Sequence, residues 1–397
     1  MNPLKLGVIG LGGRGLGLLK DILLPNRKVE VVAVCDLYPD RAEAGAKAVE
    51  EKCGKKPFLS VDANEIIQHS AVEAVMIFSA WESHIPIAIA AMQAGKAVGL
   101  EVGGAYSIQQ CWDLVRTYEA TKTPIMLMEN CCYGRRELLV LNMVQQGVLG
   151  EIVHCAGGYH HDLRKEIAFG KENRHYRLRN YLNRNCENYP THELGPIAKV
   201  LDINHGNRML TLTSTASKAA GMHAYVAAQK NDDAKLLQKA FQQGDIVTTV
   251  IRCAGGQTIT LTLDTTLPRY YSRGFTVRGT KGMYEECTDS VFIDQQDNKF
   301  DFDWAGNWGN AKNYFEKYEH PIWRQYLKEG VQGGHDGMDW LVFNAFFDSI
   351  LNHQPCPIDV YDTASWMCIT SLSEISVLNG GAPVEIPDFT NGMWIQR

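Results

Sequence analysis

The first 130 residues alternate short apolar runs with longer stretches of helical spacing. The apolar runs, which we expect to form buried strands, are Leu4–Ile9, Val29–Cys35, Val72–Phe78, Lys96–Val102 and Ile125–Met128. Between them, Pro86–Ala94 and Ile108–Ala120 have the periodicity and composition of helices. Strands and helices in alternation predict a parallel sheet joined by right-handed crossovers.

After about residue 150 the pattern changes to a period of two. In Gln257–Leu267, Ile259, Leu261 and Leu263 alternate with threonines, and Leu210–Ser217 and Asp245–Cys253 look similar. This alternation is typical of an open, largely antiparallel sheet with unlike faces. Helical patterns return in Met338–Leu351 and Tyr361–Leu378.

Composition indicates the partners and the compartment of the protein, but not any reaction that it catalyses. The 45% hydrophobic and 21% charged residues are an ordinary globular balance, and the net charge of −6 without a basic run argues against nucleic-acid or membrane partners. The 11 cysteines include no C-x-x-C, which fits a reducing compartment. Because the N-terminus runs directly into a strand with no export-signal pattern, we expect a cytoplasmic protein.

The first strand ends in Gly10-Leu11-Gly12-Gly13-Arg14-Gly15, which is G-x-G-x-x-G followed by a helical stretch, Arg14–Leu24. A second strand then ends in Asp36. In this order the glycines permit a tight turn, close approach of a pyrophosphate and close helix packing. The carboxylate suits a ribose diol and would repel a 2′-phosphate, so the motif predicts NAD rather than NADP.

Three more residues follow later strands of the predicted sheet, where ligands collect in such folds. Glu101 ends the strand Lys96–Val102, and Trp81 and His84 follow the strand Val72–Phe78. Trp81 and His84 can flank the nicotinamide. Simple packing explains Trp81 equally well, and capping of a helix at the surface explains His84 equally well.

The chain is too long for one ordinary core, so we expect two domains. Residues 1–130 would form a Rossmann NAD-binding domain of the α/β class. Residues 131–397 would form an α+β domain, with an open and largely antiparallel sheet, for substrate binding and oligomerisation. Its C-terminal helices can pack back on the first domain. The threonine-rich sheet face predicts a homodimer or homotetramer.

These features resemble the Gfo/Idh/MocA oxidoreductases. That superfamily usually has Glu-Lys-Pro at the later strand end, where this chain has Glu101-Val102-Gly103 and lacks the lysine. Five further motifs resemble the NAD-dependent glycosidases of glycoside hydrolase family 109, typified by α-N-acetylgalactosaminidases. They are ENCCYGR at 129–135, HHDLR at 160–164, Tyr189-Pro190-Thr191-His192, YYSRG at 270–274 and GGHDGMD at 333–339.

The resemblance implies that NAD is held tightly and recycled. It takes hydride from C3 of a hexose or N-acetylhexosamine glycoside, the aglycone leaves by elimination across C1 and C2, water adds, and the hydride returns. Such a route needs proton-handling groups rather than two carboxylates about C1. The resemblance implies His192, Tyr189, Tyr271 and Glu101 as catalytic, and Tyr133, Arg177 and Arg179 as contacts to the sugar. It places Asn130 near the nicotinamide.

The stretch Asn188–Pro196 contains two of the implied catalytic residues, Tyr189 and His192. If a helix begins near Thr191 or His192, Pro196 falls in its first turn, and the positive helix end favours a neutral imidazole. A buried histidine that caps the helix is the alternative for His192. Tyr189, one helical turn away, needs a neighbouring cation to act as a base, and Arg177 or Arg179 can supply it.

Two features stay open or are set aside. Glu193 stands where the family usually has glycine, and either points to solvent or redefines the sugar pocket. His160, His161 and Asp162 superficially resemble a metal site, but neighbouring strand residues point to opposite faces, so we expect no metal. The alternatives to a glycosidase are a net NAD-dependent dehydrogenase of a sugar or cyclitol and a non-catalytic NAD-binding sensor.

Overall fold

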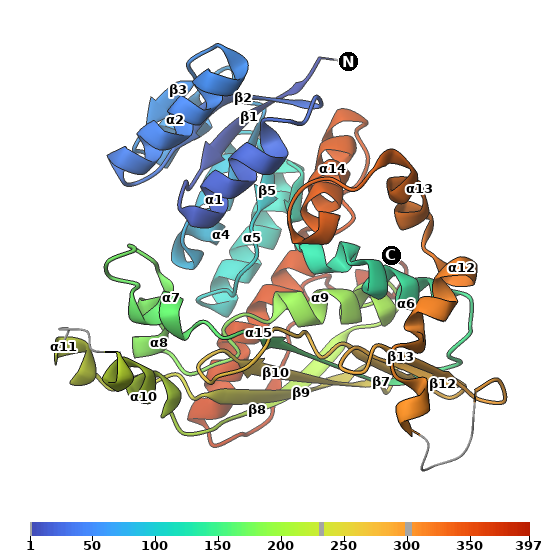
Figure 1. Ribbon diagram of the computed structural model, residues 1–397. Coiled ribbons are helices and arrows are strands. Elements are labelled where there is room, and N and C mark those ends of the chain that lie inside the picture. Colours follow the sequence, from blue (N-terminus) through green and yellow to red (C-terminus); the bar gives the residue numbers. More distant parts are fainter. Residues whose placement is uncertain (1, 230–233, 298–303) are drawn as a thin grey trace. The chain divides into compact units, whose positions relative to one another are not determined.

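The computed structural model describes residues 2–229, 234–297 and 304–397, in two compact units. The first unit comprises Met1–Tyr133 and Glu329–Ser365, and the second comprises Gly134–Lys328 and Trp366–Arg397. The chain therefore crosses between the units three times. Figure 1 traces this course along the sequence colours.

The first unit contains a six-stranded parallel sheet with the strand order β3-β2-β1-β4-β5-β6. Its strands are β1 Leu4–Ile9, β2 Val29–Cys35, β3 Phe58–Ser60, β4 Ala74–Ile77, β5 Ala97–Leu100 and β6 Ile125–Leu127. The predicted Rossmann class is confirmed, with the first two strands at the predicted bounds. β3 was not predicted because its three residues, led by an exposed Phe58, carry no pattern.

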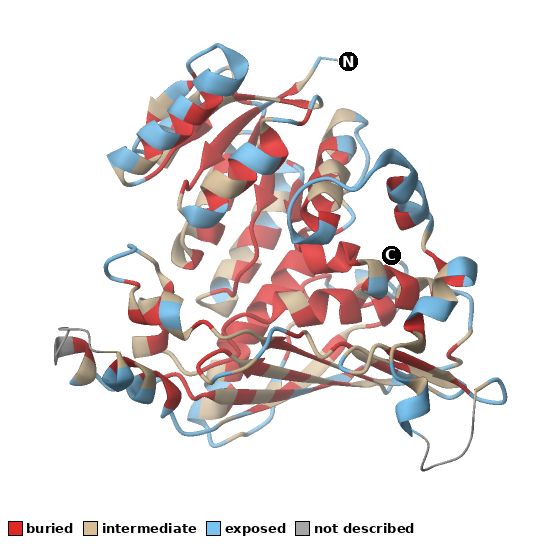
Figure 2. Ribbon diagram, viewed as in Figure 1, coloured by how far each residue is buried: buried red, intermediate tan, exposed pale blue. Residues whose placement is uncertain are grey.

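The helices of the first unit lie between these strands in the chain, except for the last of them, which follows much later. They are α1 Gly13–Leu18, which continues as a π-helical turn over Leu19–Leu23, α2 Pro39–Cys53, α3 Ala63–Gln68, α4 Trp81–Gln93, α5 Ile108–Thr121 and α14 Met338–Leu351. Figure 2 shows the central strands almost wholly buried beneath them. The predicted Met338–Leu351 helix is therefore found in this unit, far along the chain from the strands that it joins.

The second unit contains an eight-stranded mixed sheet with the order β13-β12-β11-β7-β10-β9-β8-β14. Its strands are β7 Ile152–His160, β8 Met209–Ala216, β9 Ile246–Cys253, β10 Thr258–Asp264, β11 Thr276–Gly279, β12 Gly282–Glu285, β13 Ser290–Ile293 and β14 Val384–Glu385. Among the described strands of this second sheet, only β7 and β10 pair in parallel; its other ladders are antiparallel, as predicted. In β10, Ile259, Leu261 and Leu263 are buried and the intervening threonines are half-buried.

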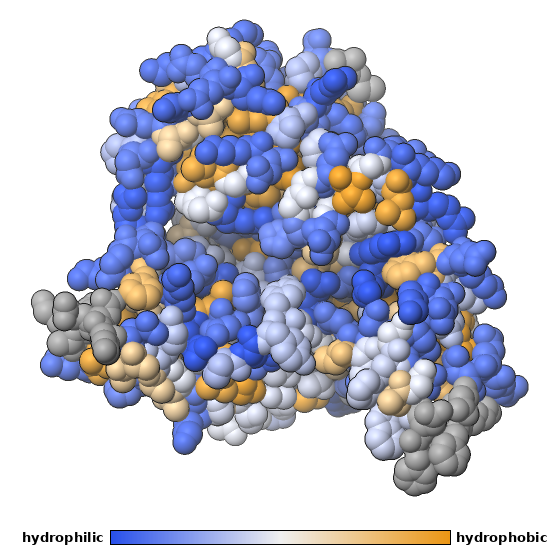
Figure 3. Space-filling view, viewed as in Figure 1, coloured by the Kyte–Doolittle hydropathy of each residue, from blue (hydrophilic) through white to orange (hydrophobic). Residues whose placement is uncertain are grey.

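Nine helices with residues in the second unit can be described. They are α6 Arg135–Gln145, α7 Arg164–Ala168, α8 Arg177–Asn183, α9 Thr191–Val200, α10 Gly221–Ala228, α11 Ala234–Leu237, α12 Phe315–Tyr318, α13 Pro321–Glu329 and α15 Val360–Leu378. Helix α9 packs against β7, and this contact positions the Tyr189–His192 stretch. Most of the surface visible in Figure 3 is hydrophilic. In the parts of the chain described, no helix combines the length and apolarity needed to cross a bilayer.

The start of α1 requires its glycines for two different reasons. Gly10 has φ +98°, and a Cβ there would lie 2.5 Å from the backbone of Phe78. Gly15 has ordinary helical geometry, but a Cβ on it would lie 2.1 Å from the carbonyl oxygen of Gly10. The turn after β1 therefore depends on both glycines.

We predict that Gly15→Ala lowers the free energy of unfolding by about 1–3 kcal/mol, because the added methyl group must push α1 away from the turn. Thermal or denaturant unfolding measures this change. Gly17→Ala is the matched control in the same helix, where a Cβ meets nothing within 4 Å. It should leave stability unchanged or raise it by up to about 1 kcal/mol. Equal losses in both variants would contradict the prediction.

Candidate active site

The glycine turn of the first unit has the open space that a dinucleotide needs. A Cβ on Gly13 would meet nothing within 4 Å, and one on Gly12 would meet only an Arg41 nitrogen at 3.5 Å. The backbone at the start of α1 is thus accessible from outside. Together with the tight Gly10 turn, this arrangement fits the phosphates of a dinucleotide.

Asp36 is held beside this turn by the backbone. It directly follows β2, is buried, and accepts a hydrogen bond from the N–H of Leu11 at 2.6 Å. Its second oxygen accepts from the N–H of Tyr38 at 2.9 Å. The carboxylate is therefore fixed where the fold places the adenosine ribose, and its charge disfavours a 2′-phosphate.

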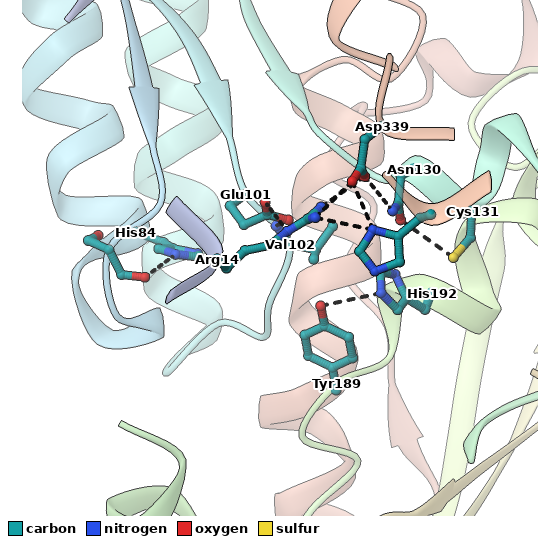
Figure 4. Close-up of polar contacts among 11 residues, drawn as sticks. Arg14, His84, Glu101, Val102, Asn130, Cys131, Tyr189, His192 and Asp339 are labelled. Carbon is teal, nitrogen blue, oxygen red and sulfur yellow. Dashed lines mark hydrogen bonds and ion pairs between the residues drawn. The ribbon is translucent and has the colours of Figure 1, made fainter. Parts of the chain in front are cut away.

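Arg14 joins the glycine turn to α14 (Figure 4). Its guanidinium donates two hydrogen bonds to Asp339, at 2.8 and 2.9 Å, and the bidentate geometry fixes both side chains. His335 Nδ1 and Asn130 Nδ2 also lie 2.8 Å from the Asp339 carboxylate. Although burial acts to raise it, the hydrogen bonds from Arg14 and His335 hold the pKa of Asp339 well below its usual range.

Glu101 lies at the edge of the same network. It follows β5, its side chain is largely buried, and one oxygen is 3.6 Å from Arg14 Nε. The other oxygen accepts from the N–H of Val102 at 3.1 Å. Glu101, Arg14 and Asn130 are therefore brought together, although Asn130 comes from a 3-10 turn, Asn130–Tyr133. Tyr133 ends that turn and is buried, and burial raises the pKa of its phenol.

Trp81 and His84 both lie in the first turn of α4 and both are buried. The Trp81 ring packs over Gly103, where a Cβ would lie 2.5 Å from the indole. His84 Nε2 is 2.9 Å from the carbonyl oxygen of Ser79, and burial lowers the pKa of His84 to about 4. His84 is thus a neutral, buried residue at pH 7, and a surface cap is the wrong description of it.

In the second unit, α9 begins at Thr191 and places His192 in its first turn. Pro196, however, lies one turn further than predicted, inside the helix, so it has no N–H to offer the carbonyl of His192. His192 Nε2 lies 3.5 Å from the hydroxyl of Tyr189, and the two rings meet edge to face at 4.9 Å (Figure 4). The two predicted proton-handling groups are therefore in contact.

Tyr159 of β7 lies at the centre of this cluster. Its ring is 4.4 Å from that of Tyr189 and 5.5 Å from that of His192. Its hydroxyl is 3.0 Å from His161 Nδ1, and the His161 ring meets that of Tyr271 at 5.1 Å. Burial and then the charge of Arg177 lower the pKa of His161, which favours its neutral form. Tyr271 is thus connected to the His192 pair through the rings of His161, which the sequence singled out only as part of an apparent metal cluster, and of Tyr159, which it did not single out.

Of the two predicted cations, Arg177 is the one beside Tyr189. The Arg177 guanidinium carbon lies 5.1 Å from the centre of the Tyr189 ring, and its Nε is 2.6 Å from Glu166. Although burial acts to lower it, the surrounding phenols and Glu166 raise the pKa of Arg177 above its usual value. Arg179, on the same helix, is exposed. A permanent cation therefore lies next to the Tyr189 phenol.

The remaining predicted residues have other surroundings. Tyr271 is 47% exposed, and Arg273 Nη1 lies 3.4 Å from its hydroxyl. His160 turns away from His161 toward Gly158 and Gly274, as expected for adjacent strand residues. Glu193 is buried, with its Cβ close to Gly157 of β7, so it does not point to solvent.

Comparison with known proteins agrees with a Rossmann unit that binds a dinucleotide. Residues 4–128 match the oxidoreductase family with an NAD-binding Rossmann fold. Solved structures with the same fold include an NAD-binding oxidoreductase from Klebsiella pneumoniae, with a TM-score of 0.71 at 16% identity, covering 98% of this chain and 100% of that one. A levoglucosan dehydrogenase, solved with NADH and L-sorbose, gives a TM-score of 0.67 at 18% identity, with coverages of 98% and 100%. The protein thus has the architecture of the Gfo/Idh/MocA oxidoreductases and an NAD-binding domain.

Residues 133–396 match the C-terminal domain of glycosyl hydrolase family 109. A family 109 protein from Stenotrophomonas maltophilia is 39% identical over 100% of this chain and 91% of its own length. An α-N-acetylgalactosaminidase from Tannerella forsythia is 37% identical over 99% of this chain and 88% of its own length. The chain belongs to glycosyl hydrolase family 109, and it is an NAD-dependent glycosidase by class.

We predict that Asp339→Asn lowers the free energy of unfolding by about 1–3 kcal/mol at pH 7, because Arg14 loses a charged bidentate partner while remaining only partly exposed. Denaturant titration measures this loss. Since the folded pKa of Asp339 is depressed, the contribution of the wild-type residue is present above the usual aspartate pKa and fades as the pH falls through the folded value.

Asp336→Asn is the matched control. Asp336 is exposed in the same loop, and its positive φ of 53° is one that asparagine adopts readily. We expect its stability to stay within about 0.5 kcal/mol of the wild type. If Asp339→Asn were as stable as the wild type, or if Asp336→Asn lost as much stability, the Arg14–Asp339 ion pair would not stabilise the fold as predicted.

Proposed function

We propose that the protein hydrolyses a hexose or N-acetylhexosamine glycoside by transient oxidation at C3, with NAD held tightly and regenerated in each cycle. The bound cofactor would supply the hydride acceptor for C3 in its oxidised form and the hydride donor for the last step in its reduced form, so no net oxidation would result. The observation that carries the proposal is the Tyr189–His192 contact beside the buried cation of Arg177. The family membership and the α-N-acetylgalactosaminidase names of two relatives support it.

In this proposal His192, which lies in the first turn of α9, accepts the proton of the C3 hydroxyl. Tyr189 contacts the sugar and assists removal of the C2 proton. Arg177 lies beside Tyr189 and supplies the neighbouring cation that a phenol needs in order to act as a base.

Tyr271 approaches the leaving-group side, where Arg273 Nη1 donates to its hydroxyl oxygen. We further propose that Glu101 and Tyr133 contact the sugar, and that Asp36, Trp81, His84 and Asn130 hold the cofactor. These roles do not need a second carboxylate beside C1, unlike those of ordinary glycosidases. A homodimer or homotetramer and a cytoplasmic location remain predictions.

The test of this mechanism uses nitrophenyl glycosides, with α-N-acetylgalactosaminides first because of the relatives' names. We expect release of aglycone without accumulation of NADH, together with exchange of the C2 proton for deuterium in heavy water. NADH formation in proportion to sugar would instead identify a net dehydrogenase. The absence of both reactions across α and β glycosides of glucose, galactose and their N-acetyl forms would reject the proposal.

Substitutions of His192 and Tyr271 test their proposed catalytic roles. We predict that His192→Ala and Tyr271→Phe each reduce kcat at least about 100-fold while NAD stays bound, because each removes a proton-handling group and leaves the first unit intact. Absorbance and fluorescence of the purified protein report the cofactor. Tyr270→Phe is the matched control, since Tyr270 is 77% exposed and adjacent to Tyr271. Unchanged turnover in both active-site variants would overturn the assignment.

A further inference from the structure

Two side chains near the end of β7, Tyr159 and His161, contact the residues to which the proposed function gives chemical roles. The centre of the Tyr159 ring is 4.4 Å from that of Tyr189 and 5.5 Å from that of His192. The centre of the His161 ring lies 5.1 Å from that of Tyr271, with the two planes at 88°. One of the two side chains thus faces the Tyr189–His192 pair, and the other faces Tyr271.

A hydrogen bond joins Tyr159 to His161. The Tyr159 hydroxyl is 3.0 Å from His161 Nδ1, and the two rings meet edge to face at 5.6 Å. A phenol can donate or accept, and a neutral imidazole has one nitrogen of each kind, so the bond forms in either tautomer. Burial lowers the pKa of His161, which favours that neutral form. Because the bond holds the outer end of the Tyr159 side chain, each ring restrains the other.

The backbone that carries these side chains is fixed from two sides. β7 is paired with β10 up to its last residue, His160, and the N–H of His161 then donates to the carbonyl of Asp264 at 3.0 Å. On the other side, His160 and Ser272 exchange two backbone hydrogen bonds, at 3.1 and 3.0 Å. Since Ser272 directly follows Tyr271, the loop with Tyr271 is tied to the same point of β7.

We propose that Tyr159 and His161 are positioning residues, which together fix the spacing between the Tyr189–His192 pair and Tyr271. This inference rests on the proposed function for the roles of those three residues, whereas the contacts themselves do not depend on it. In the proposed reaction the pair acts on the protons at C3 and C2, and Tyr271 acts at the leaving-group side, so both must reach one sugar at once. A shift of either would misalign one step without weakening the binding of the sugar as a whole.

The first test measures the hydrogen bond and needs no activity. Tyr159→Phe and His161→Phe each remove one partner of the bond and keep a ring in place. We expect each to lower Tm by about 2–4 °C. Because both remove the same bond, the double variant should lose clearly less than the sum of the two single losses. Additive losses would reject the bond.

The second test follows positioning through the nuclear magnetic resonance signal of His192 in protein with isotope-labelled histidine. The signal is identified by its loss in His192→Ala. We expect Tyr159→Phe and His161→Phe to shift it, the second variant acting through Tyr159. His154→Phe is the matched control, since His154 lies on the same strand and its Nδ1 is 2.9 Å from the Thr258 hydroxyl. It should leave the signal in place. An unchanged signal in both test variants would overturn the positioning role.

The third test measures kcat and KM separately. His161→Asn keeps an amide on the carbon that bears Nδ1, so it can still bond to the Tyr159 hydroxyl, but it lacks the ring that faces Tyr271. His161→Phe keeps the ring and loses the bond. We expect each variant to lower kcat about 5- to 50-fold with KM within about twofold of the parent. His154→Phe should keep both constants.

Exchange of the C2 proton of the free sugar for deuterium separates the two sides of the site. This exchange needs oxidation at C3 and removal of the C2 proton but no leaving group, so in the proposal it depends on the Tyr189–His192 pair. We expect it to slow in Tyr159→Phe and His161→Phe. It should stay near the parent rate in His161→Asn, in which only the contact with Tyr271 is lost. Losses of equal size in all three variants would indicate general disruption and contradict the proposal.

The outcomes distinguish the two proposals. If the parent shows no glycosidase activity, the proposed function fails, while the Tm cycle and the His192 signal still decide whether Tyr159 and His161 position their neighbours. If the parent is active and both His161 variants keep its kcat, the positioning role is rejected and the proposed function stands. Should His161→Phe not fold, Tyr159→Phe decides, since it removes only one hydroxyl.

Discussion

The bidentate contact between Arg14 and Asp339 fixes the organisation of the first unit. It links the turn that follows the first strand to a helix more than three hundred residues later, and it draws His335 and Asn130 to the same carboxylate. A buried carboxylate without such partners would be strongly destabilised. The site at the strand ends is therefore completed by a distant segment, and its charges are neutralised inside one unit.

The second unit solves a different physical problem, which is to pack phenols and imidazoles together beside a buried cation. Tyr159 packs against both Tyr189 and His192, and Arg177 supplies a cation next to the Tyr189 ring. Glu166 pairs with Arg177, so the guanidinium is compensated even though it is buried. Aromatic edges and a paired cation thus surround the Tyr189–His192 pair.

Local patterns were sufficient for most of the fold. The β1 and β2 strands and α14 begin and end where their apolar periods do, because each period coincides with a buried face. The tight turn at the glycines and the position of Asp36 after the second strand could also be expected from the sequence, since both depend on local backbone geometry. Short β3 and the interior position of Pro196 were missed, because neither has a periodic signal.

Long-range relations could not be read in this way. Nothing local marks Asp339 as the partner of Arg14, although both lie in motifs that were noticed. The contact of Tyr159 with His161 joins residues two apart at the end of β7, but Tyr189, which Tyr159 also contacts, comes from a distant part of the chain. The parallel pairing of β7 with β10 is equally non-local.

The discontinuity of the first unit has a consequence for biosynthesis. Its sheet emerges early from the ribosome, but α14 and Asp339 follow only after residues 134–328 have been made. At about 5–20 residues per second, that interval lasts roughly 10–40 s. During this time the nascent sheet lacks the helix that buries Phe78 against Phe343, so the N-terminal part leaves the ribosome as an incomplete core. Completion of the cofactor-binding unit is therefore a late event in the folding of this chain.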